Sequence, residues 1–279
     1  MKVLITGITG TLGQAVCKKL LADQWEVVGY SRDEFKQAQM EKHENLTLYL
    51  GDVRDRDRLI EASRQCTKIF HFAALKHVDQ LEYNPEEAIS TNVHGTENVL
   101  HAQRVNKIEK VILSSTDKAC LPINAYGMSK ALAERLVLRN PFNIVCRYGN
   151  VLASRGSVIA TFVKSIIDHN VVNITDPAMT RFWITIDQAS NFVIQCSQDQ
   201  YGLCIPPIKA APLMKVAETI ATILEKTPKY KAIQMRPGEK LHETLEFIGA
   251  EPTINSEWAT QYAENELFDL LMPIVRSLT

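Results

Sequence analysis

Four residues in one short stretch of the chain have the types and spacing of an active site. Asp117 and Lys118 follow a β-rich run that ends in hydroxyl residues, and Tyr126 and Lys130 lie in a helix-like run just beyond. Helical residues four apart share one face, so the phenol and the ammonium can point together at the carboxyl end of the preceding strand. Ligands of open α/β sheets bind at that end. The stretch therefore predicts an active site.

The Tyr126–Lys130 pair suits hydride-transfer chemistry. An ammonium beside a phenol favours the phenolate and lowers its pKa, and the lysine can also hold a nicotinamide ribose. Tyr126 can then take a proton from a substrate hydroxyl while the same carbon gives hydride to NADP⁺, with Thr116 as a neighbouring hydroxyl. The alternative is a packed tyrosine, because this spacing is frequent in helices.

Asp117 and Lys118 place an acid and a base beside that pair. Oxidation of an alcohol to a ketone makes the neighbouring C–H acidic. Lys118 could remove that proton while Asp117 protonates a β-leaving hydroxyl, so that water is eliminated before hydride returns. The alternative is that both residues cap the next helix and face solvent.

The N-terminus carries the pattern of a nucleotide-binding loop. A buried-strand pattern at residues 2–6 is followed by glycines and then by an amphipathic helical pattern. Glycine lets the backbone approach a pyrophosphate at a helix N-terminus. The spacing G-x-x-G-x-x-G, from Gly7, Gly10 and Gly13, therefore predicts a dinucleotide site.

The end of the second predicted strand, residues 26–30, indicates which dinucleotide binds. An acidic residue there would bind a ribose 2′-hydroxyl and favour NAD. Here Ser31 and Arg32 come first and Lys36 follows one turn on, and a hydroxyl with a guanidinium suits a 2′-phosphate. We therefore expect NADP rather than NAD. The alternative is a solvated helix start with Asp33 as its N-cap.

Two further strand ends add cofactor contacts. After residues 46–50, Asp52 can accept from an adenine amine while Val53 packs on the ring, or Asp52 can cap the following helix. After the fourth strand, Ala73 lets the backbone pass close to a cofactor. Lys76 could reach a cofactor or a substrate hydroxyl, or be an ordinary surface lysine.

Strand-then-helix units follow one another through the first half of the chain. They predict an α/β fold with a Rossmann-type, doubly wound parallel sheet. A long helix is expected from Asn84 to near Arg104, and polar loops are expected at 176–183 and 236–243.

The alternation becomes irregular after a sixth strand at residues 143–148. We expect an NADP-binding Rossmann domain over residues 1–150 and a smaller, mainly substrate-binding part over residues 151–279. Some later segment should return to the main sheet.

Composition narrows the class of protein. A net charge of −1 gives no electrostatic reason to expect nucleic acid or an anionic membrane as a partner. The six cysteines are scattered without metal-ligand spacing, so we predict free thiols and no metal. The first apolar run is too short for a signal peptide and no run reaches membrane-spanning length. We therefore expect a cytoplasmic protein.

A series of motifs occurs in order between residues 2 and 243: T-G-x-x-G-x-x-G, S-R-D-E-x-K, G-D-V-R-D, A-A-L-K-H-V, S-T-D-K-A-x-x-P-x-N-x-Y-G-x-S-K, R-Y-G-N-V, S-R-G-S-V, M-T-R-F-W-I-T and R-P-G-E-K-L-H-E. Together they resemble the extended short-chain dehydrogenase/reductase family. Within it they resemble the inverting UDP-N-acetylglucosamine 4,6-dehydratases (5-epimerising). The T-D-K triplet is specific, because retaining sugar-nucleotide dehydratases carry T-D-E with glutamate as base.

The resemblance implies a role for each motif residue. Tyr126 and Lys130 would run oxidation at C4, Lys118 would remove H5, and Asp117 would help expel the 6-hydroxyl. Protonation of the opposite face of C5 would invert that centre. NADP would be held by Thr9, Gly10, Thr11, Leu12, the segment from Ser31 to Lys36, Asp52, Val53 and Thr91. UDP-N-acetylglucosamine would be contacted by Lys76, Thr116, Asn150, Arg181, Arg236 and Glu239. A homo-oligomer is also expected.

Two other functions stay open. A sugar-nucleotide 4-epimerase or ketoreductase on the same fold needs Tyr126 but no base at Lys118. A non-catalytic NADP-binding regulatory protein would need neither, although the glycines, the tyrosine and the lysine are all present.

Overall fold

The computed structural model describes residues 1–152, 156–249 and 251–279. Contacts within the chain define two compact units. Unit 1 comprises Met1–Arg147 and Asp187–Pro206, and unit 2 comprises Tyr148–Ile186 and Pro207–Thr279. The segment 187–206, which lies beyond the boundary expected at residue 150, packs with the N-terminal unit.

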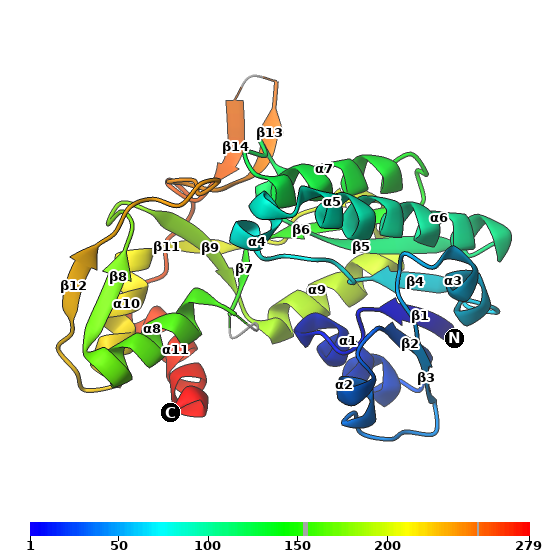
Figure 1. The fold of residues 1–279 in the computed structure, drawn as a ribbon, viewed down its shortest axis with the longest axis horizontal. Helices are drawn as coiled ribbons and strands as arrows, with labels where there is room; N and C mark the ends of the chain where they lie inside the picture. The colour runs from blue at the N-terminus through cyan, green and yellow to red at the C-terminus, as the bar shows by residue number, and fades with distance from the viewer. Residues whose placement is uncertain (153–155, 250) are drawn as a thin grey trace. The chain divides into compact units, whose positions relative to one another are not determined.

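Unit 1 is built on one sheet of parallel strands (Figure 1). Its strands are β1 (Lys2–Thr6), β2 (Glu26–Ser31), β3 (Leu46–Leu50), β4 (Lys68–His71), β5 (Lys110–Thr116), β6 (Ile144–Tyr148) and β10 (Gly202–Cys204). They form a seven-stranded sheet in the order β10-β6-β5-β4-β1-β2-β3. The pairs of β1 with β2 and β4, of β2 with β3, of β4 with β5 and of β6 with β10 are parallel. The predicted Rossmann-type, doubly wound α/β fold is confirmed.

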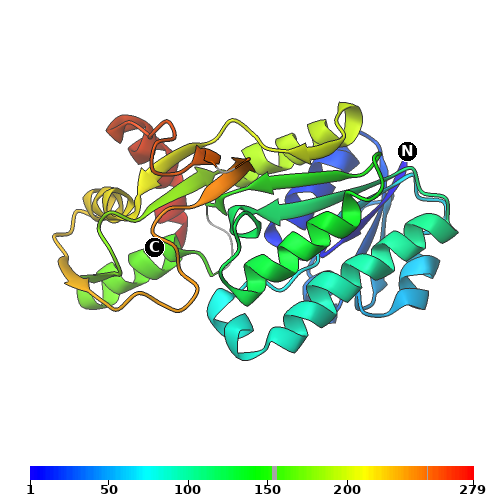
Figure 2. The same cartoon turned by 90° about the horizontal axis from the view of Figure 1, so that it is seen from above.

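Helices cover both faces of this sheet. The helical elements are α1 (Thr11–Ala22), α2 (Glu34–Ala38), α3 (Arg56–Ala62), α4 (Val78–Tyr83), α5 (Pro85–Ala88), a π-helical segment (Ile89–His94), α6 (Gly95–Val105), a 3₁₀ turn (Asp117–Ala119), α7 (Ala125–Val137) and α9 (Ile186–Asp199). Figure 2 shows α3, α6 and α7 on one face and α1 and α9 on the other. The central strands are therefore apolar on both sides, and Val3, Leu4 and Ile5 are fully buried.

The helix expected from Asn84 to near Arg104 is present as a continuous helical run from Pro85 to Val105, with a π-helical segment at Ile89–His94. The structure differs from the sequence prediction at two other places, the first being α4, which precedes this run where no helix was expected. The expected loop at 176–183 contains strand β9 (Thr180–Ile184), which pairs with β11 (Lys209–Pro212) and β7 (Asn150–Val151). Long-range pairing and complete burial of Phe182 override the polar appearance of that segment.

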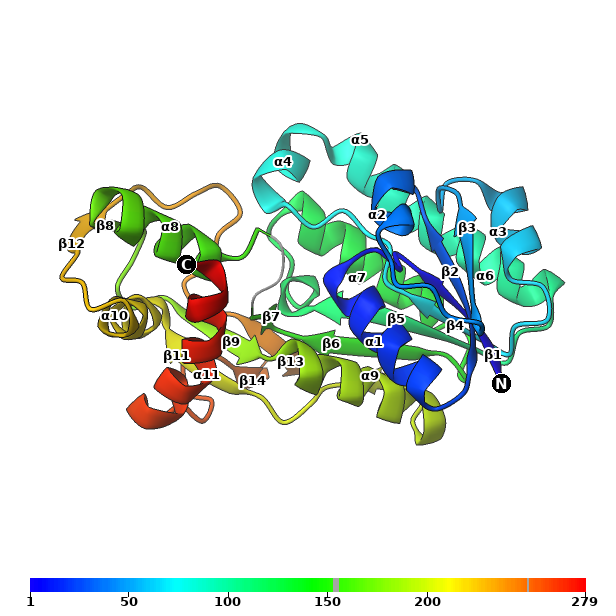
Figure 3. The same ribbon diagram turned by 90° about the horizontal axis from the view of Figure 1, so that it is seen from below.

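Unit 2 contains small sheets beside a helical cluster. Its remaining elements are α8 (Val158–His169), β8 (Val171–Ile174), α10 (Leu213–Ile223), β12 (Lys229–Ala232), β13 (Thr244–Ile248), β14 (Glu251–Asn255) and α11 (Glu264–Leu278). Figure 3 shows α8, α10 and α11 close together. Leu267, Leu271 and Val275 of α11 are fully buried in this cluster. The C-terminal segment, which carries no recognisable motif, thus contributes to the core of unit 2.

A buried histidine joins β1, β4 and α6 beneath the end of the sheet. His71 is 1% exposed, and its ring nitrogens lie 2.7 Å from Thr6 Oγ1 and 3.1 Å from Thr96 Oγ1. Thr96 donates in turn to the carbonyl of Asn92. Burial, with a smaller effect of the Lys130 charge, lowers the pKa of His71 to about 3. The imidazole is therefore neutral at physiological pH.

This buried imidazole makes stability depend on acidity. The folded pKa lies below the ordinary value of 6.5, so the unfolded chain binds the proton more readily and stability falls as the pH drops below that value. The free energy of unfolding, measured with urea, should fall by about 2 kcal/mol between about pH 7 and about pH 5 because of this group. His71→Gln, which cannot titrate, should lose that much less over the same interval. Equal losses in the two proteins would contradict this role of His71.

Candidate active site

Local backbone interactions place the start of α7 against the end of β5. Asn124 caps the helix, and its side-chain Oδ1 accepts from the Gly127 N–H at 2.7 Å. A Cβ at position 127 would lie 2.2 Å from the carbonyl oxygen of Lys118, so only glycine permits this close approach. Tyr126, the second residue of α7, is thereby fixed beside the Asp117–Lys118 turn. This capping role of Asn124 was not predicted from the sequence.

Asp117 lies at the centre of the polar cluster. It is fully buried, and its Oδ1 accepts from Thr116 Oγ1 at 2.9 Å and from Lys118 Nζ at 3.0 Å. Its Oδ2 is buried without a hydrogen-bond partner. Thr116, rather than Asp117, caps the 3₁₀ turn. The solvent-facing alternative is therefore wrong for Asp117, and one carboxyl oxygen stays available for an exchangeable proton.

Tyr126 and Lys130 share the buried side of α7. Tyr126 forms a side-chain hydrogen bond with Thr116, and burial raises the pKa of Tyr126 to about 12 despite the nearby Lys118 charge. Lys130 is 3% exposed and its Nζ donates to the Ser114 carbonyl at 2.8 Å. The expected lowering of the Tyr126 pKa by Lys130 is thus wrong for this structure, because burial outweighs the charges and Lys118 is the cation acting on the phenol.

The glycine loop packs closely on the end of β4 and leads into α1 without a side-chain cap. Gly7 has φ of +71°, and a Cβ there would lie 2.7 Å from the Ala73 backbone nitrogen. Gly10 caps α1 without a side-chain hydrogen bond, so side chains do not occupy the first N–H groups of the helix. The other predicted loop residues, Thr9, Thr11, Leu12 and Gly13, lie in this loop and the first turn of α1.

Charged side chains surround the expected 2′-phosphate position. Asp33 caps α2 by accepting from the Lys36 N–H at 3.0 Å and also pairs with the Lys36 ammonium, as the alternative interpretation expected. Arg32 has a half-exposed side chain and lies 3.4 Å from Asp52. Ser31 is buried, and its hydroxyl accepts from Gln37, which sequence reasoning missed, at 2.9 Å.

Asp52 is engaged by arginine rather than by the following helix. Its carboxylate accepts from Arg54 Nη2 at 2.8 Å, and these hydrogen bonds hold the pKa of Asp52 below its usual value although burial opposes them. Asp55, not Asp52, caps α3, so the capping alternative for Asp52 is wrong. Val53 beside it is buried.

The π-helical segment holds a second polar cluster. Thr91 is 4% exposed, and its Oγ1 has no hydrogen-bond partner. Asn92, which was not predicted as a site residue, accepts from the Leu75 N–H at 2.8 Å and donates to the Leu75 carbonyl at 3.0 Å and to Ser129 Oγ at 3.0 Å. These contacts fix the backbone next to Lys76, whose side chain is exposed. The sequence offered only an amide in a helical pattern as a signal.

The remaining predicted substrate contacts lie in unit 2. Arg181 is 5% exposed and donates to the carbonyls of Thr180 at 2.7 Å, Lys240 at 2.8 Å and Leu241 at 3.1 Å. It therefore holds the charged loop at residues 236–243 in place. In that loop the Arg236 N–H donates to Glu239 Oε2 at 3.2 Å, and Asn150 lies in β7 beside Trp183. Ser154 and Arg155 of the S-R-G-S-V motif lie outside the described residues.

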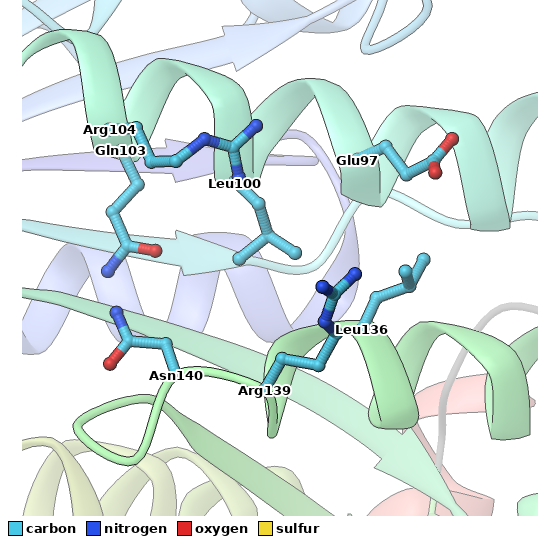
Figure 4. Close-up of a pocket in the computed structure, with 7 residues that line it drawn as sticks. All are labelled: Glu97, Leu100, Gln103, Arg104, Leu136, Arg139 and Asn140. Atoms are coloured by element: carbon cyan, nitrogen blue, oxygen red, sulfur yellow. The ribbon is translucent and has the colours of Figure 1, made fainter.

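A cavity of about 550 Å³ lies between α6 and the end of α7 (Figure 4). It is lined by Glu97, Leu100, Gln103, Arg104, Leu136, Arg139 and Asn140. None of the predicted site residues lines it. It is therefore separate from the Asp117–Lys130 cluster.

Within residues 1–152, 156–249 and 251–279, no three His, Cys, Asp or Glu side chains form a group that could hold a metal ion. In the same ranges no helix has the length and apolar character needed to cross a membrane. All six cysteines are free and buried.

The glycine loop after β1, the parallel sheet and the Tyr126–Lys130 pair define a Rossmann-type protein of the short-chain dehydrogenase/reductase class. Residues 3–263 match the family described as "Polysaccharide biosynthesis protein", and the chain belongs to this family. The family resemblance inferred from the motifs is thereby confirmed.

Individual relatives carry two different names. The chain is 40% identical over 260 residues to a UDP-N-acetylglucosamine 4,6-dehydratase (inverting) of Campylobacter jejuni strain 81-176, covering 87% of this chain and 76% of that protein. It is 39% identical over 261 residues to a UDP-glucose 4-epimerase of Rickettsia bellii strain OSU 85-389, with the same coverage. The crystal structure of Pen from Bacillus thuringiensis superposes with a TM-score of 0.91 and 30% identity, covering 99% of this chain and 98% of that one.

Proposed function

We propose that this protein is an inverting 4,6-dehydratase of UDP-N-acetylglucosamine that uses NADP. The observation that carries the proposal is the Lys118 ammonium 3.0 Å from the buried Asp117 carboxylate, next to the Tyr126 phenol. This arrangement combines the tyrosine of a dehydrogenase with a separate acid and base. Similarity to the dehydratase of C. jejuni supports the same function.

The residues of this chain divide the reaction between them. Tyr126 accepts the proton of the C4 hydroxyl, the Lys118 charge favours its phenolate, and Lys130 would hold the nicotinamide ribose. A bound dinucleotide would supply the hydride acceptor for C4 and the hydride donor for C6. After the oxidation a proton passes from Lys118 Nζ to the Asp117 carboxylate. The neutral amine then removes the proton at C5, and the carboxylic acid protonates the departing 6-hydroxyl, so that one water leaves. A proton then reaches the opposite face of C5, which inverts that centre.

The residues around the glycine loop fit a nicotinamide dinucleotide. The close approach of Gly7 to Ala73 and the α1 N-terminus without a side-chain cap suit a pyrophosphate. Thr91, with its buried unpartnered hydroxyl, offers a further hydrogen bond on the same unit. In unit 2, Arg236 and Glu239 are the residues we assign to the UDP-sugar, while Arg181 acts by holding their loop.

The epimerase function is the alternative, since an equally similar relative carries that name. A 4-epimerase needs Tyr126 and a hydroxyl such as Thr116, but it has no step that requires a base at C5. The pairing of Lys118 with a buried carboxylate therefore favours the dehydratase. A regulatory protein without catalysis would have no need of the Tyr126–Lys130 pair.

A product assay separates these functions. Purified protein incubated with UDP-N-acetylglucosamine and NADP⁺, without added reductant, should give a product lighter by one water. A product of unchanged mass that differs only at C4 would support the epimerase instead. Dinucleotide binding without turnover would support the regulatory protein.

Arg32→Ala should weaken NADP⁺ much more than NAD⁺. The Arg32 guanidinium is half exposed beside Asp52. A 2′-phosphate could replace Asp52 as its partner and bind it in a bidentate way. We expect the binding affinity to fall about 10-fold for NADP⁺ and about 2-fold or less for NAD⁺, measured by titration calorimetry. Arg64→Ala is the control, because this exposed arginine of unit 1 has no assigned role in the cofactor site. Equal losses for both dinucleotides would contradict the assignment to NADP.

A cytoplasmic location and a homo-oligomeric state complete the proposal. The six free thiols fit a reducing compartment. Light scattering of the purified protein tests the oligomeric state. A monomer at working concentration would contradict the proposed homo-oligomer.

A further inference from the structure

A second buried acid lies on α7, one helical turn beyond Lys130. Glu134 is 3% exposed, and its Oε1 accepts from Ser115 Oγ at 2.5 Å and from Arg147 Nε at 3.0 Å. Its Oε2 accepts a further short hydrogen bond from Arg147 Nη2. The carboxylate thus ties α7 to both β5 and β6 within unit 1. None of the steps assigned above uses it.

Glu134 and Lys130 bind neighbouring residues of the same strand. Lys130 Nζ donates to the carbonyl of Ser114, and Glu134 accepts from the hydroxyl of Ser115. Residues four apart on a helix lie on one face, so the two charges face β5 together. The ammonium and the carboxylate therefore depend on the same strand-to-helix contact.

The charged groups around Lys130 indicate how Glu134 affects its protonation. On α7 the charged group that acts on Lys130 is Glu134, and from β4 Lys130 faces His71, which is neutral at physiological pH. Burial lowers the pKa of Lys130 to about 8, and the Glu134 charge counteracts that lowering. Glu134 therefore both accepts from the buried Arg147 guanidinium and acts on the charge of the buried Lys130.

We propose that Glu134 is a positioning residue that keeps the Lys130 ammonium charged and held against β5 for the redox step. The inference rests on the proposed function only in assigning Lys130 to that step. The simpler alternative is that Glu134 and Arg147 merely brace the helix against the sheet.

The pH dependence of turnover distinguishes these two roles. Glu134→Gln keeps the size and the hydrogen-bond acceptor but removes the charge. In the pH–rate profile, activity is lost on the alkaline side as Lys130 gives up its proton. For Glu134→Gln this alkaline limb should move to lower pH by about one unit. Ser115→Ala is the matched control, because it removes a contact to the same carboxylate and leaves the charge. Its limb should coincide with that of the wild type.

The outcomes separate failure of this inference from failure of the proposed function. If the wild type forms no dehydrated product, the proposed function fails. The same variants are then compared by the pH dependence of NADP⁺ binding, which Lys130 affects through the ribose. If the wild type is active and the Glu134→Gln limb is unchanged, Glu134 is only a brace and the inference is overturned.

A second variant keeps the test valid if the buried Arg147 destabilises Glu134→Gln. Adding Arg147→Met removes the guanidinium that donates to Glu134, and replacing both members of a buried pair is often tolerated. The alkaline limb should still move to lower pH, because the Glu134 charge is the one that acts on Lys130. A limb at the wild-type position in this double variant would also overturn the inference.

Discussion

Lys118→Ala is expected to abolish the loss of water. Lys118 is the only group to which the proposed reaction assigns removal of the C5 proton, and a positioned base contributes on the order of 10²–10⁴-fold in rate. The variant should form the dehydrated product at least about 10³-fold more slowly, measured by mass spectrometry of quenched reactions. Oxidation at C4 should survive in part, because Tyr126 and Lys130 remain.

The charge of Lys118 must be separated from its role as a base. Lys118 also lowers the pKa of Tyr126, so its removal slows the first step as well. Lys118→Arg keeps the positive charge but cannot give up its proton at working pH. We therefore expect Lys118→Arg to allow more C4 oxidation than Lys118→Ala and equally little elimination. Rapid elimination by the arginine variant would show that another group is the base.

Tyr126→Phe should stop the reaction one step earlier. The phenol is the proton acceptor for the C4 hydroxyl, and without it neither ketone nor dehydrated sugar can form. Turnover should fall by about 10³-fold or more, while the dissociation constant of NADP⁺ changes little. Single-turnover formation of reduced dinucleotide, followed by its absorbance, measures this step directly.

An exposed tyrosine with no assigned role provides the control for this variant. Tyr83 is 86% exposed, so Tyr83→Phe should retain wild-type turnover. The Lys118 charge lowers the pKa of Tyr126, although burial outweighs that effect. Substantial activity of Tyr126→Phe would contradict the role of the phenol and with it the assignment of the redox step.

The elements that carry the site were predictable because their signals are local. The Gly7 turn, the apolar strands and the Tyr126–Lys130 spacing depend on residues close in sequence, and the structure has strands and helices at those places. Four residues of one stretch were enough to predict a strand end followed by a helix. The buried position of Asp117 also follows from its place at the end of a central strand.

What the sequence could not reveal depends on contacts between distant residues. Arg181 was expected to face substrate, whereas its guanidinium donates hydrogen bonds to carbonyls some 60 positions away in the sequence. Asn92 holds the Leu75 backbone and contacts Ser129, and no local sequence pattern predicts those partners. The pKa of Tyr126 moved opposite to expectation because the degree of burial is a property of the folded chain.

The stereochemistry at C5 tests the central claim most directly. The purified protein should be incubated with UDP-N-acetylglucosamine and NADP⁺ in deuterated water, and the product analysed by NMR. We expect loss of one water, a deuteron at C5 and inverted configuration at that carbon, because Lys118 removes the proton and its replacement arrives from solvent on the opposite face. A deuteron at C5 with retained configuration, or a sugar that has kept its 6-hydroxyl, would contradict it.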